Sequence, residues 1–141
     1  MNNQRNFINQ GQRKDPSYDV PIDEARIKKI LAGDAAEMNK YADQLGRYYT
    51  GSKNERDNLS TSQIRNVLDE IHKMKEFSST KLELLRPKLV YAAGKHNKVV
   101  RLRQFVDLMN KTINHVNKDN FEQFKNFVEA IVAYHRFYGG K

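Results

Sequence analysis

The sequence predicts an all-α fold, a compact bundle of five or six helices. Apolar residues recur at spacings of three and four through most of the chain, which is the period of a helix with one buried face. No stretch alternates apolar and polar residues between turn signals, so no segment competes as a strand. With 141 residues the chain is about one domain long, enough for a single core without disulfides or metal.

The chain divides into an arm and one domain. Residues 1–20 are rich in Asn, Gln, Arg and Lys and have few apolar anchors, which predicts a flexible N-terminal arm. We expect residues 21–141 to form a single helical-bundle domain. Within it, the polar residues 50–58 predict an exposed loop. This loop separates accessory helices in residues 21–58 from the main bundle in residues 59–141.

Two accessory helices are predicted before the loop. Pro21 can occupy the first turn of a helix that stops at Gly33, because proline tolerates that position and glycine favours a helix end. Asp34, followed by Glu37, resembles a capping box at the start of the next helix.

The helix after the loop has the clearest start signal. Ser60 and Gln63 have the spacing of a capping box, and Leu59 can pack on Ile64 as a hydrophobic staple. Its expected buried face consists of Ile64, Val67, Leu68, Ile71 and Met74.

Two further helices are expected to meet in an antiparallel pair. The first has apolar residues at helical spacing, and a kink is expected at Pro87, which lacks a backbone donor. Gly94 is expected to close this helix and Asn97 to cap the next one. The buried positions predicted for the pair are Leu82, Leu85, Leu89, Ala92, Val99, Leu102, Val106, Met109, Ile113 and Val116.

The last predicted helix is the most apolar. It is expected to open at Asp119, with Glu122 three residues later, and to end before Gly139. Its aromatic residues recur at helical spacing, so we interpret them as core rather than as stacking platforms for bases. His135 is in phase with them and is expected to be a packed, hydrogen-bonded core histidine.

Positive charge is concentrated in the second part of the chain. The net charge is +8, and residues 61–141 have 15 Lys and Arg against 8 Asp and Glu, whereas residues 1–60 have 10 against 9. A basic surface on a compact domain attracts polyanions, most commonly nucleic acid and less commonly an anionic membrane.

The densest group of cations lies where the antiparallel pair meets. We call this junction, with Lys95, Lys98, Arg101 and Arg103, the basic corner. Cations at the start of a helix are mildly destabilising, whereas free amides and nearby cations suit a bound phosphate. The alternative is that these residues are simply solvated.

The residue types exclude several kinds of catalytic site. The sequence has no Cys, hence no thiol chemistry, and its four His residues have no metal-ligand spacing. No glycine-rich phosphate loop is present. No cofactor is therefore expected. His96, at the basic corner, is the one candidate for acid–base chemistry. Tyr91 and Phe137 lie outside the main apolar periods and are the better candidates for base stacking.

Three segments resemble a known family: residues 59–66 (LSTSQIRN), residues 85–95 with VYAAGK at their end, and residues 127–141 (FVEAIVAYHRFYGGK). Their order and spacing are similar to those of the small subunit of type III-A CRISPR effector complexes, the Csm complexes. The family often has Arg where Lys95 stands, so charge is kept but not the bidentate geometry of arginine.

The resemblance implies a non-catalytic, RNA-binding helical subunit of an antiviral ribonucleoprotein that helps to monitor complementarity between guide and target. Implied partners are the guide crRNA, the target RNA, the large palm-domain subunit, the backbone subunit and further copies of itself. No membrane partner is expected and the location is cytoplasmic. The expected contacts with RNA phosphates come from six cations: Arg65, Lys88, Lys95, Lys98, Arg101 and Arg103.

Two other functions remain open from the residues alone. One is a free-standing basic helical protein that binds nucleic acid, although no helix is clearly dense in Arg, Asn or Gln as a recognition helix would be. The other is a small ribonuclease that depends on His96.

Overall fold

The computed structural model describes residues 20–51 and 58–141, and in these residues it contains six α-helices and no strand. This confirms the all-α prediction. Two predicted segments lie largely outside the described residues. They are residues 1–19 of the arm predicted over residues 1–20, and residues 52–57 at the centre of the predicted loop. The helices are α2 (Glu24–Leu31), α3 (Ala35–Thr50), α4 (Thr61–His72), α5 (Ser79–Lys95), α6 (Val100–Ile113) and α7 (Phe121–Phe137).

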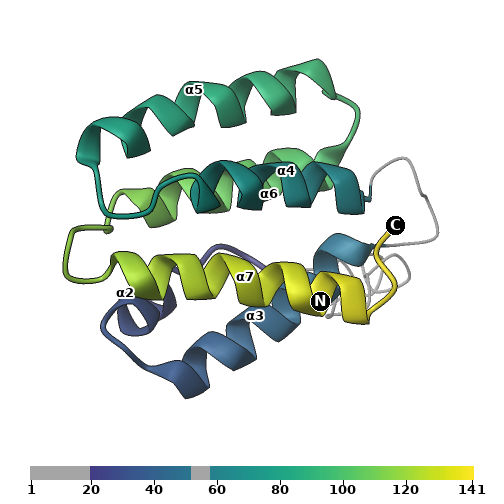
Figure 1. Cartoon of the computed structure of the whole chain (residues 1–141). Helices are drawn as coiled ribbons and strands as arrows, with labels where there is room; N and C mark the ends of the chain where they lie inside the picture. Colours follow the sequence, from purple (N-terminus) through teal and green to yellow (C-terminus); the bar gives the residue numbers. More distant parts are fainter. Residues whose placement is uncertain (1–19, 52–57) are drawn as a thin grey trace, which may run out of the picture.

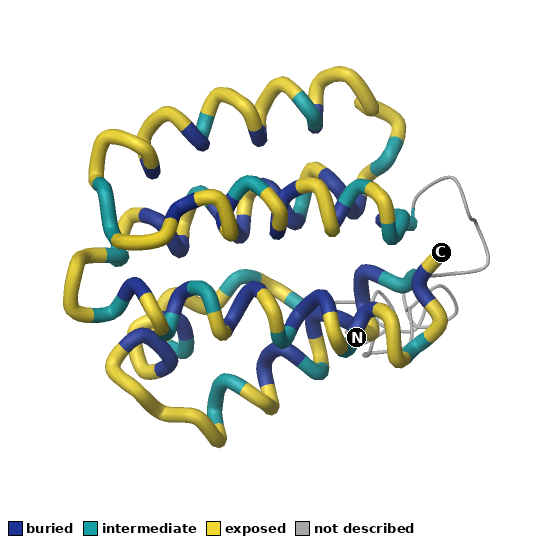
Figure 2. Tube along the Cα trace, viewed as in Figure 1, coloured by how far each residue is buried: buried dark blue, intermediate teal, exposed yellow. Residues whose placement is uncertain are grey.

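Helix α7 is the centre of the bundle. It packs along α3 and also against α2 and α4, whereas α5 lies at the outside and packs mainly on α6 (Figure 1). Buried residues line the inward sides of the helices, and those of α5 form a narrow strip (Figure 2). Buried side chains from all six helices belong to one hydrophobic cluster. The aromatic residues Phe121, Phe124 and Phe127 of α7 are in this cluster, as the sequence predicts.

The helix starts predicted for α3 and α4 are confirmed in part. Ser60 and Gln63 form the complete capping box of α4, in which each side chain accepts a hydrogen bond from the other residue's backbone N–H. Asp34 caps α3 by accepting from the amide of Glu37 at 3.0 Å, but the Glu37 carboxylate pairs with Arg26 instead of returning to the cap. Only half of that capping box therefore forms.

Helix α2 begins later than predicted. Asp23 caps it through hydrogen bonds from the amides of Ala25 and Arg26, so Pro21 precedes the helix and does not lie in its first turn. Pro21 instead accepts, through its carbonyl, a hydrogen bond from the Tyr41 hydroxyl. The predicted stop is confirmed: Gly33 follows the helix with φ of 108°, a conformation that favours glycine.

The boundaries around α5, α6 and α7 correct three further predictions. Helix α5 includes Gly94 in its last turn, with negative φ, and runs unbroken through Pro87 to Lys95. Asn97 does not cap α6, which starts after Val99 without a side-chain cap. Asp119 does not open α7, which starts after Asn120. Each boundary differs from the prediction by one or two residues, and neither α6 nor α7 has a capping side-chain hydrogen bond at its first turn.

Helices α3 and α7 approach each other closely at Gly46. A Cβ atom added at this position would lie 2.6 Å from Cβ of Tyr134 and 2.7 Å from the backbone nitrogen of His135. The close approach therefore depends on the absence of a side chain at residue 46.

His135 is the packed core histidine that the sequence predicts. It is fully buried, and its Nε2 lies 2.7 Å from the carbonyl oxygen of Leu59, the residue that leads into α4. Its pKa is lowered from 6.5, chiefly because burial disfavours the charged ring. His135 thus ties α7 to the start of α4 as a neutral hydrogen-bonding group.

Candidate nucleic-acid interface

The basic corner is formed by the end of α5, the connection after it and the start of α6. Lys95, Lys98 and Arg103 are exposed there, and none forms an ion pair with another residue in the described part of the chain. The start of α6 also has no side-chain cap. Exposed cations beside uncapped helix amides form a surface that suits an anionic backbone.

Arg65 lies near the same end of the molecule. It is exposed on the second turn of α4, and the start of α4, the end of α5 and the start of α6 lie together at one end of the bundle (Figure 1). Like Lys95, Lys98 and Arg103, it forms no ion pair with another described residue. The fold therefore places four of the six predicted site residues as exposed cations at one end of the bundle.

Lys88 is exposed but already has a partner. Its Nζ lies 3.1 Å from Glu70 on α4, and Glu70 also lies 2.9 Å from Lys73. Hydrogen bonds from Lys73 and then Lys88 lower the pKa of the Glu70 carboxyl. Because Glu70 partly neutralises Lys88, this lysine attracts a phosphate less than an unpaired lysine would.

Arg101 lies in the interior, in contrast to the other five. It is 7% exposed, and its guanidinium lies 4.3 Å from the centre of the Tyr48 ring. The Tyr48 hydroxyl in turn donates to Gln104 at 2.7 Å. A side chain so placed stabilises the contact between α3 and α6, and we leave it out of the surface proposed to contact RNA.

A signal for this burial was present in the sequence. Arg101, Phe105, Leu108 and Thr112 have the spacing of one helix face, and all four are buried. The positive charge of Arg101 indicated an exposed side chain, whereas its helical spacing with these buried residues indicated an interior position.

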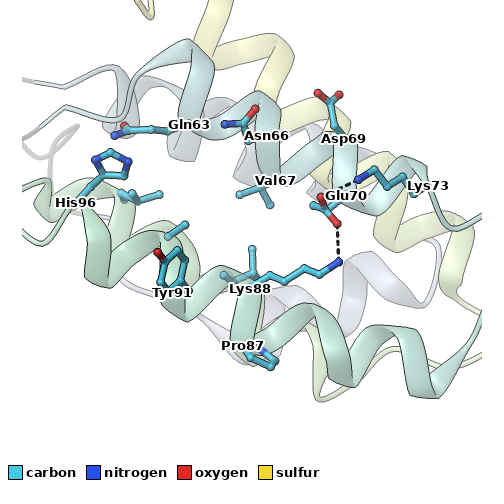
Figure 3. Close-up of a pocket in the computed structure, with 13 residues that line it drawn as sticks. Gln63, Asn66, Val67, Asp69, Glu70, Lys73, Pro87, Lys88, Tyr91 and His96 are labelled. Atoms are coloured by element: carbon cyan, nitrogen blue, oxygen red, sulfur yellow. Dashed lines mark hydrogen bonds and ion pairs between the residues drawn. The ribbon is translucent and has the colours of Figure 1, made fainter.

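A groove of about 730 Å³ runs between α4 and α5 (Figure 3). Its floor contains apolar side chains, Val67, Leu89, Ala92 and Leu102. Gln63 and Asn66 of α4, with Tyr91 of α5 and His96 just beyond it, lie toward one end, and Glu70 with its two lysines lies at the other (Figure 3). The predicted stacking candidate Tyr91 is 72% exposed on this groove, and Phe137 is 76% exposed elsewhere.

Two further histidines, His72 and His115, each pair with a carboxylate. His72 pairs with Glu129 at 2.7 Å and His115 pairs with Glu24 at 2.8 Å, each with a single carboxylate. Among the described residues, no group of three or more His, Asp or Glu side chains is placed to hold a metal ion. In the same part of the chain, no helix has the length and apolar character that crossing a membrane requires.

Comparison with known proteins identifies a family and a relative. Residues 32–141, most of the chain, match the family described as Csm2 Type III-A. The chain is also 30% identical over 91 residues to a protein of Streptococcus thermophilus described as "CRISPR system Cms protein Csm2", an alignment that covers 59% of this chain and 75% of that protein. No solved structure matches. The family match spans helices α3 to α7 and includes the exposed cations Arg65, Lys95, Lys98 and Arg103. The chain therefore belongs to the Csm2 family, the small subunits of type III-A CRISPR Csm complexes.

Proposed function

We propose that this chain is a non-catalytic subunit that contacts the sugar-phosphate backbone of guide RNA paired to target RNA. The observation that supports this most directly is the group of exposed cations at one end of the bundle, Arg65, Lys95, Lys98 and Arg103, with no ion pair to another described residue. Such cations release counterions when they meet phosphates, and the resulting binding is independent of sequence and weakens with salt.

Sequence choice would then come from base pairing between the two RNA strands. The subunit would detect the shape and continuity of the duplex and so help to monitor complementarity. Its proposed protein partners are the large palm-domain subunit, the backbone subunit and further copies of itself. We expect it in the cytoplasm, with these RNA partners.

Charge reversal at the basic corner tests the proposal. The double variant Lys95→Glu with Arg103→Glu should weaken binding of an RNA duplex. It should also lower the steepness of the salt dependence by about 0.9 for each phosphate that the protein no longer neutralises. The readouts are fluorescence anisotropy across a salt series and retention of target RNA by the co-purified complex.

A matched control reverses two charges at the other end. Lys75 and Lys118 are exposed, have no ion pair with a described residue, and lie in the α4–α5 and α6–α7 connections, opposite the corner (Figure 1). The variant Lys75→Glu with Lys118→Glu should retain the affinity and the salt slope. If both double variants weakened binding equally, net charge rather than the corner would govern binding, and the proposal would be contradicted.

The ribonuclease alternative has a separate test. His96 is exposed, and its side chain makes no hydrogen bond to another described residue that would orient it as a general base. Purified protein that cleaves labelled RNA, with loss of cleavage in His96→Ala, would favour the ribonuclease. Retention of intact bound RNA is the result that we expect.

A further inference from the structure

One end of the α4–α5 groove contains polar groups that the described part of the protein leaves unused. The side chains of Asn66, Tyr91 and His96 make no hydrogen bond to another described residue. Gln63 uses its side-chain carbonyl to accept from the amide of Ser60 at 2.9 Å, so its NH₂ group is still available as a donor. Donors, acceptors and one exposed aromatic ring therefore surround the same end.

The composition of the groove indicates what kind of ligand fits it. Lys73 and Lys88 balance Asp69 and Glu70, so the charged side chains of the lining have no net charge. The floor is apolar, and the volume of about 730 Å³ lies in the range of about 300–1,000 Å³ typical of ligand pockets. These features suit a neutral, flat group with hydrogen-bonding edges better than a phosphate.

The surroundings of this end indicate what the flat group would be attached to. Arg65 precedes Asn66 on α4, and Lys95 precedes His96 at the end of α5; both cations are exposed. A ligand whose flat part enters the groove would thus have these cations near the part that stays outside. A nucleobase on a phosphate backbone has this combination of a neutral ring and adjacent negative charge.

We propose that the end of the groove formed by Gln63, Asn66, Tyr91 and His96 binds one unpaired nucleobase of an RNA strand. The ring of Tyr91 stacks on the base, the amides of Gln63 and Asn66 meet its hydrogen-bonding edge, and the flanking phosphates lie toward Arg65 and Lys95. This inference rests on the proposed RNA function and adds a base-binding step to it. Within the paired region, an unpaired base is present only where guide and target fail to pair or where a base is displaced, so the groove would distinguish interrupted duplexes from continuous ones.

The test compares two RNA duplexes that differ by one unpaired 2-aminopurine. We expect the full-length protein to bind the duplex with the extra base about tenfold more tightly than the continuous duplex, because stacking of a base on an aromatic side chain contributes about that much affinity. Binding should also quench the fluorescence of the stacked 2-aminopurine. Tyr91→Ala should abolish both the preference and the quenching, whereas Tyr91→Phe should keep them. Tyr91 is exposed, so these variants are expected to fold.

The control is Phe137→Ala, which removes an aromatic side chain of similar exposure outside the groove and should leave the preference intact. The base site would be overturned if the wild-type protein bound the two duplexes with equal affinity. If charge reversal at the basic corner still weakened binding of both duplexes, the proposed function would stand. Failure to bind either duplex would contradict the proposed function. The inference would also be overturned if free adenosine monophosphate, added at the same concentration as the RNA duplex, removed the quenching. The site would then bind a free nucleotide rather than a base within an RNA strand.

Discussion

Replacing Gly46 by Ala tests how closely α3 and α7 pack. In the interior of a helix, Ala is about 1 kcal/mol more favourable than Gly, so the local preference alone predicts stabilisation. The structure predicts the reverse, because the new methyl group would lie 2.6 Å from Cβ of Tyr134 and 2.7 Å from the backbone nitrogen of His135. These atoms belong to the backbone or are directly attached to it, so the helices must separate to make room.

The two effects have opposite signs and can be compared. Overpacking a well-packed contact costs about 1–3 kcal/mol, and subtracting the gain in helix propensity leaves a loss of up to about 2 kcal/mol. For a domain of this size that corresponds to a fall in Tm of up to about 8 °C. The movement would also disturb the hydrogen bond from His135 to Leu59, which lies next to the clash.

Gly94 provides a matched control in the same protein. It is helical, exposed and has nothing within 4 Å of an added Cβ, so Gly94→Ala should raise Tm, by at most about 2–4 °C because Gly94 lies in the last turn of α5. Thermal and urea unfolding followed by circular dichroism would measure both variants. If Gly46→Ala stabilised the protein as much as Gly94→Ala, the close approach of α3 and α7 would be refuted.

Three further variants address the cap, the α5–α6 contact and pH. Ser60→Ala removes the capping box of α4 and should cost about 1 kcal/mol in the free energy of unfolding, measured in urea. Arg86→Ala removes hydrogen bonds from α5 to the Asn110 carbonyl at 3.0 Å and the Asn114 side chain at 2.8 Å, and should cost about 1–2 kcal/mol by the same assay. Because the pKa of His135 is lower in the folded state than its ordinary 6.5, the unfolded chain binds more protons, and stability should fall as the pH drops below 6.5 through the folded pKa. Unfolding at a series of pH values should show this loss, and His135→Asn should reduce it.

The sequence predicted the helices and most of the core because both depend on the periodic placement of apolar residues. The buried positions Leu82, Leu85 and Leu89 follow directly from that period. Helix boundaries were predicted less well, because a residue such as Asn97 caps a helix only if the helix starts directly after it, and α6 starts two residues later, after Val99.

For the candidate RNA-contacting surface, the sequence identifies the charges but not which side chains are exposed. Residue type identifies Lys95 and Arg103 as cations, but only the fold shows that Arg101 turns inward over Tyr48. The α4–α5 groove could not be predicted, since it depends on how far apart two helices lie. The family match also begins at residue 32, so it includes α3, which the resemblance in residues 59–141 did not cover.

The outer position of α5 affects how this protein would respond to a ligand. Helix α5 has 17 residues and buries four, whereas α7 has the same length and buries seven. A helix attached by so little buried surface is expected to open at a lower free energy than the whole domain, and its backbone amides should exchange with solvent sooner. A ligand held between α4 and α5 would bind only while α5 is docked, so part of its binding free energy would go into suppressing that local opening.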